Sequence, residues 1–225
     1  MTRVMTVGAI IVVVASLVAH AHDVTTNVTW NREVSRIFYA RCATCHRPGG
    51  SAFSLMSYQE ASPWARGIKD AVLTRSMPPW GAVKGFGSFR NDQALTQEEI
   101  DLVERWVNGG SPEGNPNDLP ARPKIAPPPA VESRTGELVV SGDYTLPRPF
   151  VLDGFVVRVP PGGGTARITI AFPDGRVAPL VWFDGHPAQR QQPFLLRVPL
   201  SIPAGASMRG LAGSTLVLLP PAHPR

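Results

Sequence analysis

Cys42-Ala43-Thr44-Cys45-His46 is the stretch from which the expected organisation of this chain follows. Two thiols three positions apart, with a histidine directly after the second, form the Cys-x-x-Cys-His signature of covalent c-type haem attachment. Each cysteine adds across one haem vinyl group, and the histidine gives an imidazole nitrogen to the iron. The chain holds two cysteines in 225 residues, so the motif uses both. We therefore predict one covalent haem c on Cys42 and Cys45, with His46 as an iron ligand.

Two other chemistries use a Cys-x-x-Cys pair. A zinc site needs ligands from a second cluster, and His22, His186 and His223 stand far apart in the sequence. A thioredoxin-type dithiol is expected in a βαβ unit, whereas the pattern around residues 42–46 indicates a helix followed by a Gly-rich loop. We therefore favour haem and keep zinc and a redox dithiol as alternatives.

The first residues have the parts of a secretory signal peptide. Arg3 supplies a cation, residues 4–18 are apolar, and Ala19-His20-Ala21 is an A-x-A cleavage site. We expect cleavage after Ala21 and export to the periplasm, where bacterial c-type haem is attached. An uncleaved membrane anchor is the alternative, although the apolar stretch is short for a spanning helix. After cleavage we expect no transmembrane span, with peripheral association with the envelope left open.

Composition divides the remaining chain into two parts joined by a proline-rich segment. The expected organisation is a signal peptide over 1–21, a haem domain over 22–115, a linker over 116–132 and a β domain over 133–225. Repeated prolines favour an extended, semi-rigid linker. The formal net charge is +5, and its basic residues are dispersed, so we expect no nucleic-acid partner.

The part before the linker is expected to be helical, because helix start signals precede apolar residues at helical spacing. These signals are Thr29 or Asn31 before Val34, Ile37 and Phe38, the pair Ser57 and Glu60, Ser62-Pro63 before Trp64, and the capping box of Thr96 and Glu99 before Ile100, Val103 and Trp106.

The sixth position of the iron decides what the haem can do. Met77 stands in Ser76-Met77-Pro78-Pro79-Trp80, where two prolines forbid a helix and predict an extended loop. Such a loop presents the thioether at low entropic cost. Met56 is the rival, but its position in a short apolar segment favours core packing. We therefore predict Met77 as the second axial ligand, and an open or water-filled site as the further alternative.

Residues 28–115 resemble a bacterial class I monohaem cytochrome c. The resemblance rests on the helix leading into Cys42-Ala-Thr-Cys45-His46, on Met77-Pro-Pro-Trp80, and on the run from Leu95 to Gly110. It implies thioether bonds at Cys42 and Cys45, His46 as the proximal ligand and Met77 as the distal one. Phe53, Trp64 and Trp80 are then candidates for the haem wall, with ordinary core packing as the alternative.

The part after the linker is expected to be an antiparallel β-sandwich, because short β-like runs alternate with turn signals. The runs begin at Leu138, Phe150, Phe155, Arg167, Leu180, Phe194 and Thr215, and the turn signals are Asp153-Gly154, Pro173-Asp174-Gly175, Asp184-Gly185 and Pro203-Ala204-Gly205.

Residues 179–205 resemble, more distantly, the C-terminal sandwich of copper type II, ascorbate-dependent monooxygenases. Those enzymes bind copper through a histidine pair and a methionine, but this region has His186 alone, and Met208 has no evident partner. We therefore carry over no copper ligands, and interpret His186 as a turn residue. His22, as the new N-terminus, is an unsupported copper site because no second ligand is indicated.

The expected fold class is thus multidomain, with a small all-α cytochrome c domain followed by an all-β antiparallel sandwich domain. The expected function is the transfer of single electrons to a redox partner protein through a His/Met-ligated haem iron. The alternatives are a haem enzyme or small-ligand sensor whose sixth site opens, and an electron-donating subunit of a larger oxidoreductase complex. The absence of an evident distal His or Arg near residue 77 disfavours peroxidase-like chemistry.

Overall fold

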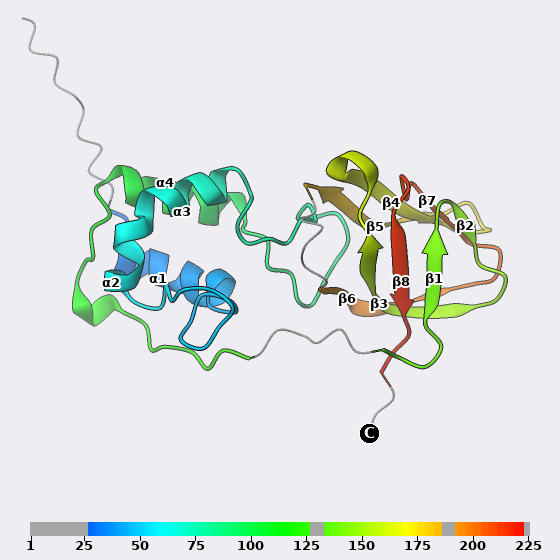
Figure 1. The fold of residues 1–225 in the computed structure, drawn as a ribbon, viewed down its shortest axis with the longest axis horizontal. Coiled ribbons are helices and arrows are strands. Elements are labelled where there is room, and N and C mark those ends of the chain that lie inside the picture. Colours follow the sequence, from blue (N-terminus) through cyan, green and yellow to red (C-terminus); the bar gives the residue numbers. More distant parts are fainter. Residues whose placement is uncertain (1–26, 127–132, 186–191, 223–225) are drawn as a thin grey trace, which may run out of the picture.

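The computed structural model describes residues 27–126, 133–185 and 192–222. Figure 1 shows short helices at one end of the molecule and strands at the other, and the described residues form eight strands. The predicted signal peptide lies outside the described residues, as do His22 and His186. No helix in the described ranges is long and apolar enough to cross a bilayer.

The helical end is built from short elements. The first stretch alternates between helix types, with π-helical turns at Trp30–Val34 and Phe38–Cys42 on either side of α1 (Ser35–Ile37). The other elements are α2 (Tyr58–Ala61), a 3₁₀ turn at Ser62–Trp64, α3 (Ala65–Leu73), α4 (Gln97–Asn108) and a 3₁₀ turn at Pro116–Asp118.

The helix starts predicted from capping residues are confirmed. The Thr29 side chain accepts a hydrogen bond from the backbone N–H of Arg32 at 3.3 Å. Ahead of α4, the backbone N–H of Glu99 donates to Thr96 Oγ1 at 3.1 Å, and the N–H of Thr96 donates to Glu99 Oε2 at 2.7 Å. This reciprocal pair satisfies two N–H groups that have no partner within the helix.

Three aromatic rings form the centre of the helical core. The Trp30 ring lies 4.9 Å from that of Phe38 and 5.9 Å from that of Trp106, in edge-on and tilted arrangements. Trp106 is fully buried, and its indole N–H donates to the carbonyl of Pro112 at 3.0 Å. The segment after α4 is therefore fastened to the core of the helices.

The strands form two four-stranded antiparallel sheets, with the orders β1-β8-β3-β6 and β2-β7-β4-β5. Their bounds are β1 (Leu138–Ser141), β2 (Tyr144–Thr145), β3 (Phe150–Val159), β4 (Thr165–Ala171), β5 (Val177–Asp184), β6 (Pro193–Ile202), β7 (Ser207–Arg209) and β8 (Thr215–Leu219). A 3₁₀ turn at Gly162–Gly164 joins β3 to β4.

The predicted turn at Asp153-Gly154 is wrong, because both residues lie inside β3. The register with β6 shifts there, which marks a β-bulge. A Cβ at Gly154 would lie 2.5 Å from the carbonyl oxygen of Phe194, so only glycine lets the two strands approach this closely. The runs that begin at Phe150 and Phe155, predicted as two strands, are thus one strand, β3.

The expected fold class is also wrong in its first half, because the chain is mostly β and its helices do not form a separate all-α domain. Residues 80–91, named the strap here, come from the region assigned to the helices but pack with the sheets. Ala82 forms a β-bridge with Phe183, and Phe89 forms one with Leu196. Figure 1 shows the chain between α3 and α4 running from the helices to the sheets and back.

The carboxylate of Asp153 fastens the strap to β3. Arg90 donates two hydrogen bonds to it, at 2.9 and 2.8 Å, and Arg134 donates a third at 2.7 Å. Asp153 is 6% exposed. Hydrogen bonds from Arg90 and then from Arg134 hold the pKa of Asp153 below its usual 3.8, although burial acts to raise it.

We expect Asp153→Asn to lower the free energy of unfolding at neutral pH by about 2 kcal/mol, because two arginines lose their charged acceptor. The folded-state pKa is depressed, so the stabilisation is complete above the unfolded pKa and is lost as the pH falls through the folded value. Urea unfolding of the two proteins across acidic pH should therefore show their difference shrinking below pH 3.8.

Asp174→Asn is the matched control. Asp174 also accepts from an arginine, Arg176, but its side chain is 54% exposed on the turn between β4 and β5. Solvent screens such a pair, so this variant should differ little from the parent protein. Equal losses for the two variants would contradict the role given to Asp153.

Candidate haem attachment site

One tight turn carries the three residues of the motif. The second π-helical turn ends at Cys42, whose carbonyl accepts hydrogen bonds from the N–H of Cys45 at 3.1 Å and of His46 at 2.9 Å. The chain then returns, with the N–H of Leu55 donating to the carbonyl of His46 at 3.2 Å. Cys42, Cys45 and His46 therefore lie in one local unit.

The His46 imidazole is held by a backbone carbonyl. Its Nδ1 lies 2.9 Å from the carbonyl oxygen of Phe53, which can only accept, so Nδ1 carries the proton. In the neutral tautomer that makes this hydrogen bond, Nε2 is the nitrogen with a lone pair. A hydrogen bond at one ring nitrogen that fixes the tautomer is the usual support of a metal-binding histidine.

Cys42 packs against the helical core. Burial raises the pKa of Cys42 to about 12, with further contributions from Glu99 and Cys45, while Arg41 acts to lower it. A redox dithiol works through a cysteine of depressed pKa. The environment of Cys42 therefore does not favour the thioredoxin-type alternative.

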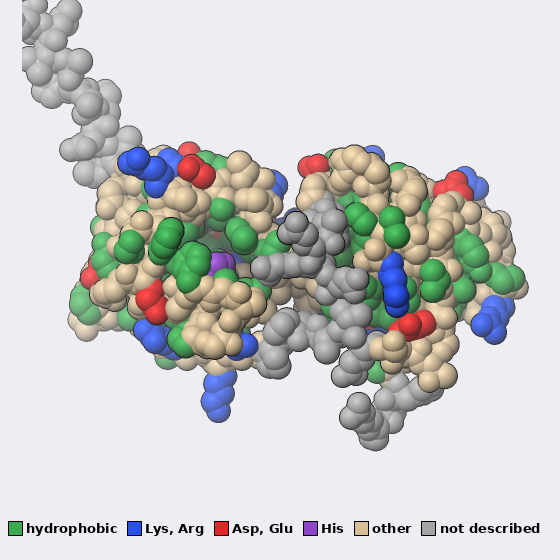
Figure 2. Space-filling view, viewed as in Figure 1, with side chains coloured by type: hydrophobic (Ala, Val, Ile, Leu, Met, Phe, Trp, Pro, Cys, Tyr) green, Lys and Arg blue, Asp and Glu red, His purple; other side chains and the backbone are tan. Residues whose placement is uncertain are grey.

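Large apolar side chains are exposed beside the motif. Phe53 is 52% and Trp64 is 55% exposed, and their rings lie 5.0 Å apart. The Phe53 ring also lies 5.0 Å from the His46 imidazole, edge-on. Figure 2 shows a histidine (purple) in a hollow of the helical end with hydrophobic side chains (green) around it, and His46 is the one histidine among the described residues. Exposed apolar patches of this kind mark binding sites.

Met77 follows α3 in a loop and is 39% exposed. Its backbone N–H donates to the carbonyl of Ala71 at 3.2 Å. Its side chain lines a cavity of about 740 Å³ between the helices and the sheets, but Cys42, Cys45 and His46 do not line it. The structure therefore does not bring Met77 together with the motif in one cavity.

Met56 and Trp80, the other two residues considered from sequence, are buried. Met56 is 6% exposed and packs with Tyr39 and Ala43. Trp80 is 2% exposed and belongs to the core of the sheets, where its ring lies 4.7 Å from that of Phe194. Core packing thus accounts for both.

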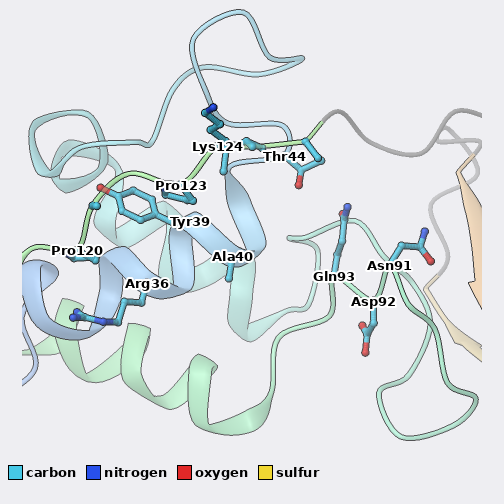
Figure 3. Close-up of a pocket in the computed structure, with 13 residues that line it drawn as sticks. Arg36, Tyr39, Ala40, Thr44, Asn91, Asp92, Gln93, Pro120, Pro123 and Lys124 are labelled. Atoms are coloured by element: carbon cyan, nitrogen blue, oxygen red, sulfur yellow. The ribbon is translucent and has the colours of Figure 1, made fainter. Parts of the chain in front are cut away.

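A second hollow, of about 640 Å³, lies on the helical end near the chain that leads to the linker. Figure 3 shows its residues coming from three segments, 36–44, 91–93 and 120–126. Thr44 is the one motif residue in its lining, which contains neither thiol nor the imidazole of His46. This hollow is therefore separate from the candidate site.

No three His, Cys, Asp or Glu side chains among the described residues lie close enough to hold a metal ion between them. Cys42, Cys45 and His46 are therefore not a metal-holding group of this kind.

No family model, no curated protein and no solved structure matches the chain.

Sequence reasoning missed the carbonyl of Phe53 as the partner of His46. Any residue carries such a carbonyl, so no residue type signals it. The fold of the loop between residues 46 and 55 alone brings it to the imidazole.

We expect Trp64→Ala to change the free energy of unfolding of the haem-free protein by less than about 1 kcal/mol, because this side chain is more exposed than buried. Trp106→Ala is the control, and should cost about 3–5 kcal/mol through the cavity it leaves in the helical core. Chemical unfolding followed by circular dichroism measures both. A large loss for Trp64→Ala would make this side chain structural rather than part of a binding surface.

Proposed function

We propose that this chain is an exported c-type haem protein that carries one covalent haem and transfers single electrons. The observation that carries the proposal is the His46 imidazole, whose Nδ1 is anchored on the Phe53 carbonyl at 2.9 Å while Nε2 remains available as a ligand. It follows a pair of thiols at the spacing that haem attachment requires.

The groups at the motif are those that a covalent haem uses, namely two thiols and an imidazole. Among the described residues they do not belong to a cluster of three His, Cys, Asp or Glu side chains of the kind that holds zinc. The exposed rings of Phe53 and Trp64 supply an apolar surface for the haem ring.

When bound, the haem supplies a reversible one-electron couple at its iron. The chain supplies the rest. Cys42 and Cys45 would hold the ring covalently, the Phe53 carbonyl would orient His46, and Trp64 would offer an apolar surface through its contact with Phe53. We further propose that Met77 would be the second protein ligand of the iron, where a methionine would raise the reduction potential.

A haem enzyme or small-ligand sensor is the second candidate. The exposure of Met77, on a loop that lines a different cavity, favours a sixth position that opens. In either case the proposed location is the periplasm, and the proposed partner of the electron carrier is a redox protein that docks where the haem edge is exposed.

The attachment is tested by expressing the protein in the periplasm with haem-maturation proteins. Haem should remain with the polypeptide after denaturation, and Cys42→Ala combined with Cys45→Ala should abolish this retention, because no thioether can form. The His46→Ala protein should lose the low-spin absorption spectrum. Absence of haem from the parent protein would overturn the proposal and return the thiols to zinc or dithiol chemistry.

The axial ligand is tested with carbon monoxide. Met77→Ala should lower the reduction potential, remove the methionine-to-iron charge-transfer band and open the reduced iron to carbon monoxide. Met56→Ala should leave these properties unchanged while costing about 2 kcal/mol of stability, because Met56 is a buried core residue. A parent protein that binds carbon monoxide as readily as Met77→Ala would favour the sensor or enzyme.

A further inference from the structure

The cavity of about 740 Å³ lies where the helices meet the sheets. Among the described residues that line it, none belongs to the motif from Cys42 to His46. Small-molecule sites have volumes of about 300–1,000 Å³ and are found preferentially where two structural units meet. The size and the position of this cavity are therefore those of a ligand site that is separate from the haem attachment site.

The buried part of the lining is apolar. Its members are Val72, Leu95 and Ile100 from the helical core, and Trp80 and Ala82 from the core of the sheets. An apolar ligand body that packs against these side chains leaves water, and each CH₂ group buried in this way favours binding.

Charged side chains in the lining are exposed. Among the described residues they are Arg75, Lys84 and Asp184. The ammonium of Lys84 lies 2.7 Å from the carboxylate of Asp92, so its charge is paired. Arg75 has no carboxylate partner in the described part of the chain, and its guanidinium donates to the neutral amide oxygen of Gln97 at 3.0 Å. Arg75 is therefore the cation that an anionic ligand can reach.

The N-terminus of α4 adds positive potential beside Arg75. Gln97 is the first residue of this 12-residue helix, so the guanidinium lies at the positive end of the helix dipole. The two acidic residues of the first turn, Glu98 and Glu99, do not line the cavity, and Glu99 is paired with Arg41 at 3.0 Å. The helix and the arginine thus favour an anion at the same place.

Asp184 lies on a different wall. It is the last residue of β5 and belongs to the sheets, whereas Arg75 follows α3 and belongs to the helices. A ligand with a single carboxylate is therefore expected to place it at Arg75, with its apolar body against the buried lining.

We propose that this cavity binds a small apolar monocarboxylate, such as a medium-chain fatty acid. The carboxylate replaces the amide oxygen of Gln97 on the Arg75 guanidinium, which can donate two parallel hydrogen bonds to it. The hydrocarbon chain lies against Val72, Ile100 and Trp80. Binding here does not require haem, because the cavity and the motif share no residue. Its absence would therefore leave the proposed haem function as it stands.

Isothermal titration calorimetry of the purified protein with octanoate, 1-octanol and octylamine tests the site. Octanoate should bind most tightly, and Arg75→Gln should weaken it by about tenfold or more, because the charge-assisted hydrogen bonds are lost. Arg66→Gln is the matched control, since Arg66 is an exposed arginine of α3 outside the lining, and it should bind octanoate as the parent protein does.

Three results of this titration would overturn the proposal: no binding of octanoate, equal affinity for octanoate and 1-octanol, or equal losses in the two arginine variants. Tightest binding of octylamine would also overturn it, and would assign the cavity to a cation at Asp184.

The indole N–H signals of the five tryptophans locate the ligand by NMR. Octanoate should shift the signals of Trp80 and Trp182, which line the cavity, and leave those of Trp30 and Trp106 in the helical core unchanged. Butanoate should shift the same signals with lower affinity, because fewer CH₂ groups are buried. Shifts confined to Trp64 would place octanoate on the exposed rings beside the motif, and would overturn the assignment to this cavity.

Discussion

Two of the four edge strands in the described sheets, β5 and β6, set the main constraint on this fold, since each has a row of backbone N–H and C=O groups on the side away from its sheet. Uncovered edges of this kind pair with other chains. Here the strap satisfies them, with Ala82 bridged to Phe183 and Phe89 bridged to Leu196. The strap lies between α3 and α4 in the sequence, but in the structure it covers the edges of the two sheets.

The Asp153 carboxylate adds charge to this backbone pairing. It lies at the bulge of β3 and accepts hydrogen bonds from Arg90 of the strap and from Arg134. The guanidinium of Arg134 also donates a hydrogen bond to the carbonyl of Pro220 at 2.7 Å. A buried carboxylate needs such partners, because desolvation without them would cost several kcal/mol. One acidic residue thus joins the strap, the start of the β region and the end of β8.

The candidate site combines a local unit with a distant one. The turn from Cys42 to His46 and the carbonyl of Phe53 lie within twelve residues, and their arrangement does not involve the sheets. Met77 is different, because its loop is fixed at one end by α3 and at the other by Trp80 in the core of the sheets. The motif therefore depends on the helical end alone, whereas the position of Met77 depends on both ends.

The sequence alone determined the helix start at Thr96, the turn at Asp174-Gly175 between β4 and β5, and the spacing of the two thiols and the imidazole, and it limited the first helix start to Thr29 or Asn31. These are local features, which depend on hydrogen bonds and backbone preferences of residues only a few positions apart. Only the tertiary structure decided that Gly154 lies at a bulge, that Trp80 belongs to the sheets, and that the helices do not form a domain of their own. Those outcomes depend on contacts between residues about 40 to more than 100 positions apart, such as Phe89 with Leu196, and the pattern of one segment holds no information about its distant partner.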